Sequence, residues 1–124
     1  MSELRQKYLK NTKKVVVKVG SRILVDSQSN SIRTKFVNKL ATSIAKIQDS
    51  GKQVVLVSSG AVGAGMAALN LTKRPKNMGK VQACASVGQL KLMHYYEAAF
   101  KKKNMQVGQV LVSADDFRSR KRYA

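Results

Sequence analysis

Two short apolar runs, each followed at once by a glycine turn, dominate the hydrophobic pattern of the chain. The first is Lys14 to Val19, KVVVKV, which leads into Gly20-Ser21, and the second is Gln53 to Val57, which leads into Ser58-Ser59-Gly60. Runs this short and this rich in β-branched residues favour strands over helices. The second run holds four consecutive apolar residues, which predicts a strand buried on both faces.

Between and after these runs, apolar residues recur at helical spacing. The spacing predicts a helix from Ile32 to Ser50 that Gly51 would end, a helix of small residues from about Ala61 to Leu69, and a long helix from Lys80 to Lys103. Strand, helix, strand and helix in this order are typical of βαβ units. We therefore predict an α/β fold with a mainly parallel sheet and helices packed on its faces.

The rest of the chain is predicted to hold one more strand and the start of one more helix. Gln106 to Val112, QVGQVLV, has strand-like composition, and Ser113 to Asp116, SADD, offers side chains that cap a helix N-terminus. A helix that begins near Asp115 has little room before the sequence stops. We therefore expect a domain that is cut rather than finished.

Length and charge limit the class of protein. The 124 residues, 44% of them hydrophobic, suit one domain, which we place at residues 14–124 after a basic N-terminal extension over residues 1–13. Lys and Arg number 24 against 6 Asp and Glu, which gives a net charge of +18. Such a charge predicts attraction to polyanions, whether phosphate-bearing ligands, nucleic acid or an acidic membrane surface.

Cysteine content and hydropathy indicate the compartment. Cys84 is the one cysteine, so an internal disulfide and a multi-cysteine zinc site are excluded, and we expect a reducing compartment, the cytoplasm. No window approaches the ~18 consecutive apolar residues of a membrane helix, so no membrane partner is expected. The first fourteen residues also lack the apolar core of a secretory signal.

The first candidate site is the turn after the first strand. Lys18 stands near the carboxyl end of that strand, directly before Gly20 and Ser21. Ligands of open α/β sheets bind outside the carboxyl ends of the strands, where a lysine can stabilise negative charge on a phosphoryl group. An edge-strand lysine that points to water is an equally good interpretation of the pattern alone.

The second candidate site is the turn after the second strand. If a helix begins at Ala61, its free backbone N–H groups face the Ser59-Gly60 turn and can bind a phosphate or carboxylate. The spacing fits neither a Walker motif nor a dinucleotide fingerprint. From Gly63 onward we interpret the small residues as a means for the helix to pack closely on the sheet.

Other chemistry-bearing residues have structural explanations. His94 is a lone histidine on the long helix, Cys84 is a small core residue on its apolar stripe, and helix capping accounts for Asp115 and Asp116. The basic clusters are predicted to be solvated faces, because few aromatic residues accompany them as stacking platforms for single-stranded nucleic acid. These clusters are Lys73, Arg74 and Lys76; Lys101 to Lys103; and Arg118, Arg120, Lys121 and Arg122.

Four ordered blocks of the sequence resemble the N-terminal half of the glutamate 5-kinase family, which also occurs in the kinase portion of bifunctional pyrroline-5-carboxylate synthase. They are VVVKVGSRIL, VVLVSSGAVGAGMAAL, QACASVGQLKLM and VGQVLVSADDFRSRKRY. The resemblance covers Lys14 to Ala124, although its lysine-glycine and serine-glycine blocks recur across the wider amino-acid kinase family. It implies a three-layer α/β/α amino-acid kinase fold with a mainly parallel sheet, here truncated.

The resemblance also implies an activity. It is transfer of the γ-phosphoryl group of ATP, bound with Mg²⁺, to the side-chain carboxylate of L-glutamate, the first step toward proline. Carried over residue by residue, Lys18 matches the catalytic lysine that contacts the ATP phosphates. Gly20 and Ser21 match the turn beneath those phosphates, and Ser59, Gly60 and Ala61 match the glutamate-binding loop. No position is matched to a protein ligand of a metal.

Members of the family run on to an Asp and an Asn that bind glutamate and to a later half that holds the nucleotide, and many bacterial members end in a PUA domain. These segments are not in the sequence, so we expect the chain to be inactive or incomplete alone. A separately encoded C-terminal half, or a homo-oligomer, would be its partner. The alternatives are a basic remnant that binds nucleic acid or other polyanions without catalysis, and a related kinase that acts on aspartate or uridylate.

Overall fold

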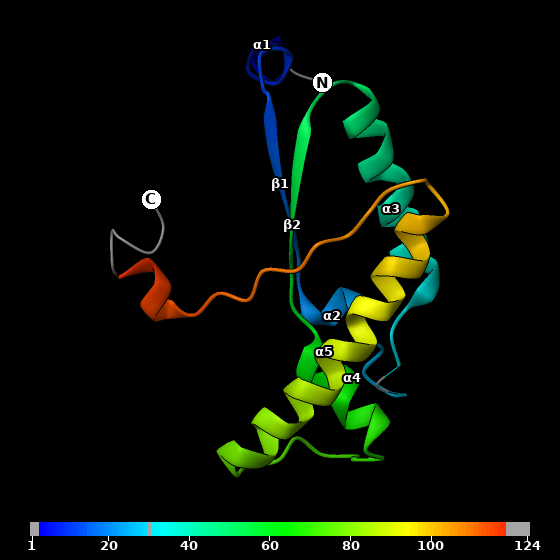
Figure 1. Ribbon diagram of the computed structural model, residues 1–124, viewed down its shortest axis with the longest axis vertical. Helices are drawn as coiled ribbons and strands as arrows, with labels where there is room; N and C mark the ends of the chain where they lie inside the picture. The colour runs from blue at the N-terminus through cyan, green and yellow to red at the C-terminus, as the bar shows by residue number, and fades with distance from the viewer. Residues whose placement is uncertain (1–2, 30, 119–124) are drawn as a thin grey trace.

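The computed structural model describes residues 3–29 and 31–118, in which short strands alternate with helices (Figure 1). Three predicted helices are confirmed with bounds that differ by at most two residues, and the one expected near Asp115 is a short 3-10 helix. Helices α1 and α2 were not predicted. In chain order the elements are α1 (Glu3–Lys10), β1 (Lys14–Val19), α2 (Ser21–Leu24), α3 (Thr34–Asp49), β2 (Gln53–Ser58), α4 (Ala61–Ala68), α5 (Met78–Lys101) and the 3-10 helix η1 (Ala114–Phe117).

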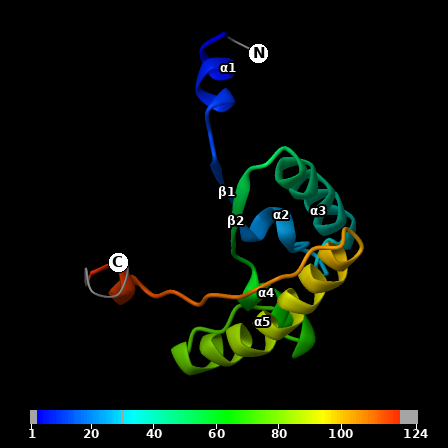
Figure 2. The same ribbon diagram turned by 45° about the horizontal axis from the view of Figure 1, so that its top comes forward.

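Strands β1 and β2 form a parallel pair, as the βαβ pattern predicts. Their register runs from Lys14 opposite Gln53 to Val19 opposite Ser58. The crossover between them contains α3, which lies to one side of the strands in both ribbon views (Figures 1 and 2). Because the strands are parallel and in register, their carboxyl ends lie at the same edge of the sheet.

Helices α3 and α5 cover one face of this sheet. Side chains that alternate along the strands, including Val17, Val54 and Leu56, pack against a single cluster of buried apolar residues. Removal of this apolar surface from water, at about 25 cal/mol per Å², holds strands and helices together. The buried members of the cluster include Val19, Leu24, Ile32, Val37, Ile44, Leu92, Tyr96 and Phe100.

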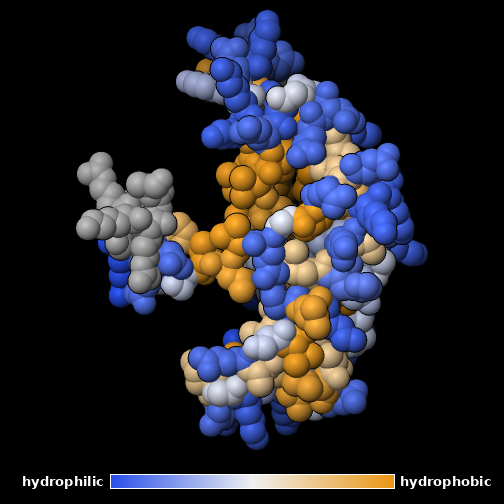
Figure 3. All heavy atoms as spheres, viewed as in Figure 1, coloured by the Kyte–Doolittle hydropathy of each residue, from blue (hydrophilic) through white to orange (hydrophobic). Residues whose placement is uncertain are grey.

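The opposite face of the sheet is exposed, so the prediction that the second strand is buried on both faces is wrong. Val16 is 67% exposed and Val55 is 57% exposed, and Val57 is exposed beside them. In the described part of the chain no helix lies over these side chains, and they form an apolar patch at the surface (Figure 3). The described residues therefore form two layers, helices and sheet, and not three.

The segment 106–112 is extended but is not a third strand, which corrects the prediction for Gln106 to Val112. A strand needs a neighbour whose backbone groups complete the ladder, and within the described ranges this segment has none. Gln109 accepts a side-chain hydrogen bond from Gln89 at 3.2 Å, while Val110 is 83% exposed. The segment starts at the end of α5, near α3, and crosses to η1 on the opposite side of the strands (Figures 1 and 2).

The small residues of α4 pack against α5 rather than against the sheet, which corrects the predicted partner. A Cβ atom on Gly65 would fall on the carbonyl oxygen of Cys84, and one on Gly88 would fall on the carbonyl oxygen of Ala61. The two helix backbones therefore touch where they cross. Only glycine fits at these two positions.

Two predicted helix boundaries are confirmed by backbone geometry. Gly51 follows α3 with a φ of +83°, and its N–H donates to the carbonyl oxygen of Gln48 at 2.8 Å. Ser113 and Asp116 form a capping box at η1, in which the Ser113 N–H donates to Asp116 Oδ2 at 2.6 Å. The backbone and hydroxyl donors of Ser113 lower the pKa of the Asp116 carboxyl.

Candidate functional site

The two glycine turns meet at the carboxyl edge of the β1–β2 sheet. The last pair in the register is Val19 opposite Ser58, and the backbone N–H of Ser59 donates to the carbonyl oxygen of Val19 at 3.0 Å. The Gly20-Ser21 turn follows β1 and the Ser59-Gly60 turn follows β2, so the two turns lie side by side. The two candidate sites predicted separately from the sequence are parts of one place in the fold.

Each turn opens a helix at this edge. Gly20 is the N-cap of the short α2, and Gly60 is the N-cap of α4 with a φ of +106°. That left-handed conformation favours glycine, and Gly60 also lies against Val25 and Leu24, whose carbons are 3.4 to 3.7 Å from where its Cβ would be. The free N–H groups of the first turn of α4 consequently face the loop that precedes it.

A hollow of about 310 Å³ lies at these turns. It brings together four of the six predicted site residues, Ser21, Ser59, Gly60 and Ala61. Two hydroxyl groups and the start of α4 therefore border one space. Its complete lining is Ser21, Ser59, Gly60, Ala61, Val62, Gly63 and Arg74.

Lys18 and Gly20 are not in that lining. Lys18 stands opposite Val57 in the register, and its exposed side chain is on the same face of the sheet as Val16. This is the uncovered face. Gly20 is exposed at the start of α2, next to Ser21.

A buried tyrosine on α5 forms a hydrogen bond with Ser58, directly before the second turn. The hydroxyl of Tyr96, on α5, lies 2.7 Å from Ser58 Oγ, and Ser58 in turn donates to the carbonyl oxygen of Ser59 at 3.0 Å. Burial raises the pKa of the Tyr96 hydroxyl, and the hydrogen bond to Ser58 opposes that rise. The apolar stripe indicates that Tyr96 faces the core, but nothing in the sequence pairs its hydroxyl with Ser58.

Arg74 is the charged lining residue that the sequence pattern misses. It lies in the loop between α4 and α5, where a run of basic residues indicates only a solvated surface. Lys73 and Lys76 of the same loop are exposed and do not line the hollow. The one available signal is that Arg74 directly precedes the single proline, Pro75, which restricts its backbone to extended conformations.

Comparison with known proteins places the chain in a family. The model of the amino acid kinase family matches residues 13–124, which is most of the chain. The chain belongs to the amino acid kinase family. The predicted resemblance to glutamate 5-kinases is also confirmed.

This amino acid kinase chain is similar to glutamate 5-kinases from several bacteria. It is 42% identical over 120 residues to the glutamate 5-kinase of Citrifermentans bemidjiense, covering 97% of the chain and 32% of the relative. It is 45% identical over 115 residues to that of Aromatoleum aromaticum, covering 93% and 31%. The chain therefore spans about a third of the length of the curated relatives it matches.

The remaining candidate residues of this amino acid kinase chain that the structure describes lie outside the hollow at the two turns. Cys84 is fully buried, as predicted, and His94 is exposed. Asp115 forms an ion pair with Arg118 at 3.2 Å. Across the described ranges no three His, Cys, Asp or Glu side chains gather as a metal site, and no helix is long and apolar enough to cross a membrane. Arg120, Lys121 and Arg122 lie outside the described residues.

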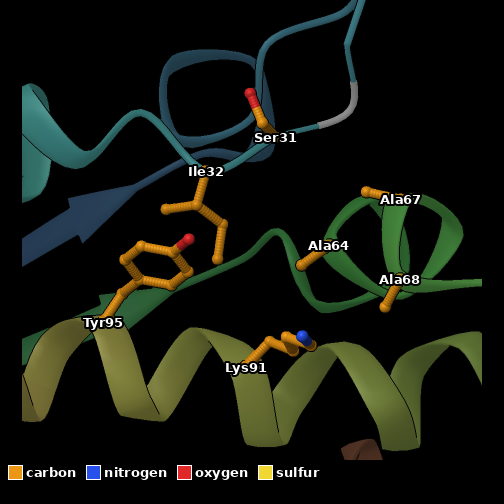
Figure 4. A pocket seen from close by; sticks show the side chains of 7 residues that line it. All are labelled: Ser31, Ile32, Ala64, Ala67, Ala68, Lys91 and Tyr95. Carbon is orange, nitrogen blue, oxygen red and sulfur yellow. The ribbon is translucent and has the colours of Figure 1, made fainter.

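A second, smaller hollow of about 210 Å³ lies between α4, α5 and the loop before α3 (Figure 4). Asp26 accepts backbone hydrogen bonds in that loop from Gln28 and Ser29, both at 3.0 Å. The hollow is largely apolar and contains none of the predicted site residues. Its lining is Ser31, Ile32, Ala64, Ala67, Ala68, Lys91 and Tyr95.

Proposed function

We propose that this chain forms the N-terminal part of the active site of a glutamate 5-kinase. The reaction transfers the γ-phosphoryl group of ATP to the side-chain carboxylate of L-glutamate: a carboxylate oxygen forms the new P–O bond, and ADP leaves as the old P–O bond breaks. The observation that carries the proposal is the meeting of the two glycine turns at one sheet edge. The similarity to glutamate 5-kinases supports it. Such an enzyme would work in the reducing cytoplasm.

The residues at this edge fit an anionic nucleotide and an amino-acid substrate. Phosphoryl transfer requires mainly positioning and groups that stabilise negative charge. Under the proposal, Lys18, Gly20 and Ser21 hold the ATP phosphates, with Lys18 as the catalytic residue. Ser59, Gly60 and Ala61 hold glutamate. The lining of the hollow contains hydroxyl groups and a guanidinium but no carboxylate, so it suits anions.

Mg²⁺ would enter with the nucleotide. None of the residues that line the hollow is an Asp or Glu, so the described part of the chain offers it no carboxylate ligand there. Bound to the phosphates, the ion would neutralise part of their charge. The protein groups proposed here would add N–H, hydroxyl and ammonium donors around the same phosphates.

We further propose that the active kinase is completed by a C-terminal portion, encoded separately or continuous with this chain. The relatives are about three times longer than the matched segment. The apolar face around Val16 and Val55 lies open beside Lys18. A covering layer there would enclose the lysine and produce the three-layer fold of the family. A homo-oligomer is the other arrangement that would cover it.

A hydroxamate assay for γ-glutamyl phosphate tests the function. With ATP, Mg²⁺ and L-glutamate, we expect no product from this chain alone and product when the C-terminal portion of a glutamate 5-kinase is added. In the completed enzyme, Lys18→Met should lower turnover more than tenfold. Lys14→Met, at the far end of the same strand, is the matched control. If the completed enzyme phosphorylated aspartate or uridylate and ignored glutamate, the substrate assignment would be wrong.

The net charge of +18 favours one further candidate function, polyanion binding without catalysis. Such binding would fall steeply with salt, because neutralised phosphates release counterions. Fluorescence anisotropy with a labelled RNA measures it. Micromolar affinity at physiological salt would support this candidate, and no binding at low salt would remove it.

A further inference from the structure

We infer that Arg74 positions the amino-acid substrate by binding the carboxylate that is not phosphorylated. The inference rests on the proposed function and adds a residue to it. Arg74 lines the same hollow as Ser59, Gly60 and Ala61, the residues proposed to hold glutamate, although it comes from a different part of the chain. A cation that joins a substrate loop from a separate segment is placed to contact the substrate.

The loop that carries Arg74 is tied down at both ends. At its start the backbone N–H of Leu71 donates to the carbonyl oxygen of Met66, at 2.8 Å. At its end the Asn77 side chain caps α5 by accepting from the backbone N–H of Lys80 at 3.2 Å. Pro75 restricts the backbone of Arg74 itself. The guanidinium is therefore delivered by a loop with few conformations, which reduces the entropy cost of binding.

Arg74 is also available for an anionic ligand. It is the one ionisable side chain among the described residues that line the hollow. Within the described residues, 3–29 and 31–118, the ion pairs are Arg33 with Asp26 and Arg118 with Asp115. Neither pair involves Arg74. With only 6 acidic residues in the chain, there is little internal competition for its charge.

The chemistry of the reaction selects which anion it binds. A guanidinium binds a carboxylate through two parallel hydrogen bonds, and this draws electron density from both oxygens. The side-chain carboxylate of glutamate must keep a nucleophilic oxygen, whereas the α-carboxylate has no chemical part in the transfer. Arg74 consequently suits the α-carboxylate. The phosphates of ATP are the other source of oxyanions at this edge.

Calorimetric titration of the completed enzyme, in which this chain is joined by the C-terminal portion of a glutamate 5-kinase, separates these ligands. The variant is Arg74→Gln, with Arg74→Lys as the conservative form, and Lys73→Gln and Lys76→Gln as controls that make the same charge change in the same loop. The probes are L-glutamate, L-glutamine, which keeps the α-carboxylate, isoglutamine, which has an amide there, and ATP.

We expect Arg74→Gln to weaken glutamate and glutamine at least tenfold and to leave isoglutamine and ATP within twofold of the parent chain. Arg74→Lys should recover part of the loss, and the two controls should bind like the parent. A loss for ATP but not for glutamate would overturn the assignment in favour of phosphate. A loss for isoglutamine but not for glutamine would overturn it in favour of the side-chain carboxylate. Equal binding by the completed parent and its Arg74→Gln variant would refute the inference alone, whereas a completed parent that binds no glutamate would refute it together with the proposed function.

Discussion

The two faces of the β1–β2 sheet differ in how far their side chains are buried. One face packs against α3 and α5 in a single apolar core. The other exposes Val16, Val55 and Val57, and it also carries Lys18. The free energy of folding therefore comes from one side of the sheet, while the proposed catalytic lysine is on the other. Substitutions on the two faces should separate stability from function.

The largest expected effect is on α5, where Leu92 and Leu90 form a matched pair. Leu92 is 2% exposed and Leu90 is 76% exposed. Leu92→Ala should lower the free energy of unfolding by about 3 kcal/mol, because it leaves a cavity in the core. Leu90→Ala should change it by less than about 0.5 kcal/mol. Urea denaturation followed by circular dichroism measures both, and equal losses would contradict the one-sided core.

The next effect is at the crossing of α4 and α5. Gly88→Ala should cost about 2 kcal/mol, because its Cβ would meet the Ala61 carbonyl and overpacking outweighs the gain in helix propensity. Gly108→Ala is the control, since nothing lies within 4 Å of where its Cβ would be. Thermal unfolding of the two variants compares them. A melting temperature of Gly88→Ala at or above that of the parent would disprove the close backbone contact.

A smaller effect is expected beneath the second turn. Tyr96→Phe should cost about 1 kcal/mol, because Ser58 loses a hydrogen-bond partner in a half-buried place. The raised pKa of Tyr96 also means that the parent is stabilised below pH ~10, the ordinary tyrosine pKa, and loses that stability as pH rises through the higher folded pKa. Tyr96→Phe should lack this alkaline loss, whereas Tyr95→Phe should keep it. Unfolding curves at pH 9 and 11 test both.

The smallest effect should come from the open face. Val55→Thr should change the free energy of unfolding by less than about 0.5 kcal/mol, whereas Val54→Thr, one residue away on the core face, should cost more than about 1 kcal/mol. Denaturant titration gives the two values. If the two variants lost equal stability, something in the isolated chain would already cover the exposed side.

Local patterns were sufficient for most of the fold. β-branched runs predicted β1 and β2, helical spacing predicted α3 and α5, and their order predicted parallel pairing. The patterns failed where the outcome depends on a neighbour. Gln106 to Val112 has strand composition, but composition does not supply the adjacent backbone that makes a strand. Likewise, the apolar sequence of a strand such as Gln53 to Ser58 does not determine whether a second layer of helices covers its other face.

The candidate site divides in the same way. Glycine turns after strands predicted Ser21, Ser59, Gly60 and Ala61, and the structure gathers these around one hollow. Arg74 and the Tyr96 hydroxyl were not predictable as site neighbours, because both reach it through folding of segments distant in sequence. The assigned roles of all six residues, Lys18 and Gly20 included, stay predictions.

The register between β1 and β2 also fixes the position of the two turns relative to each other. Each residue of a strand advances the chain by roughly 3.3 Å and turns the next side chain to the opposite face. Deletion of one residue from β1 would either pull the Gly20-Ser21 turn back from Ser59 by that distance or exchange the sides occupied by Val17 and Lys18. Insertions and deletions within either strand should accordingly be poorly tolerated, because each one changes where the turn at the end of that strand lies or which face its side chains occupy.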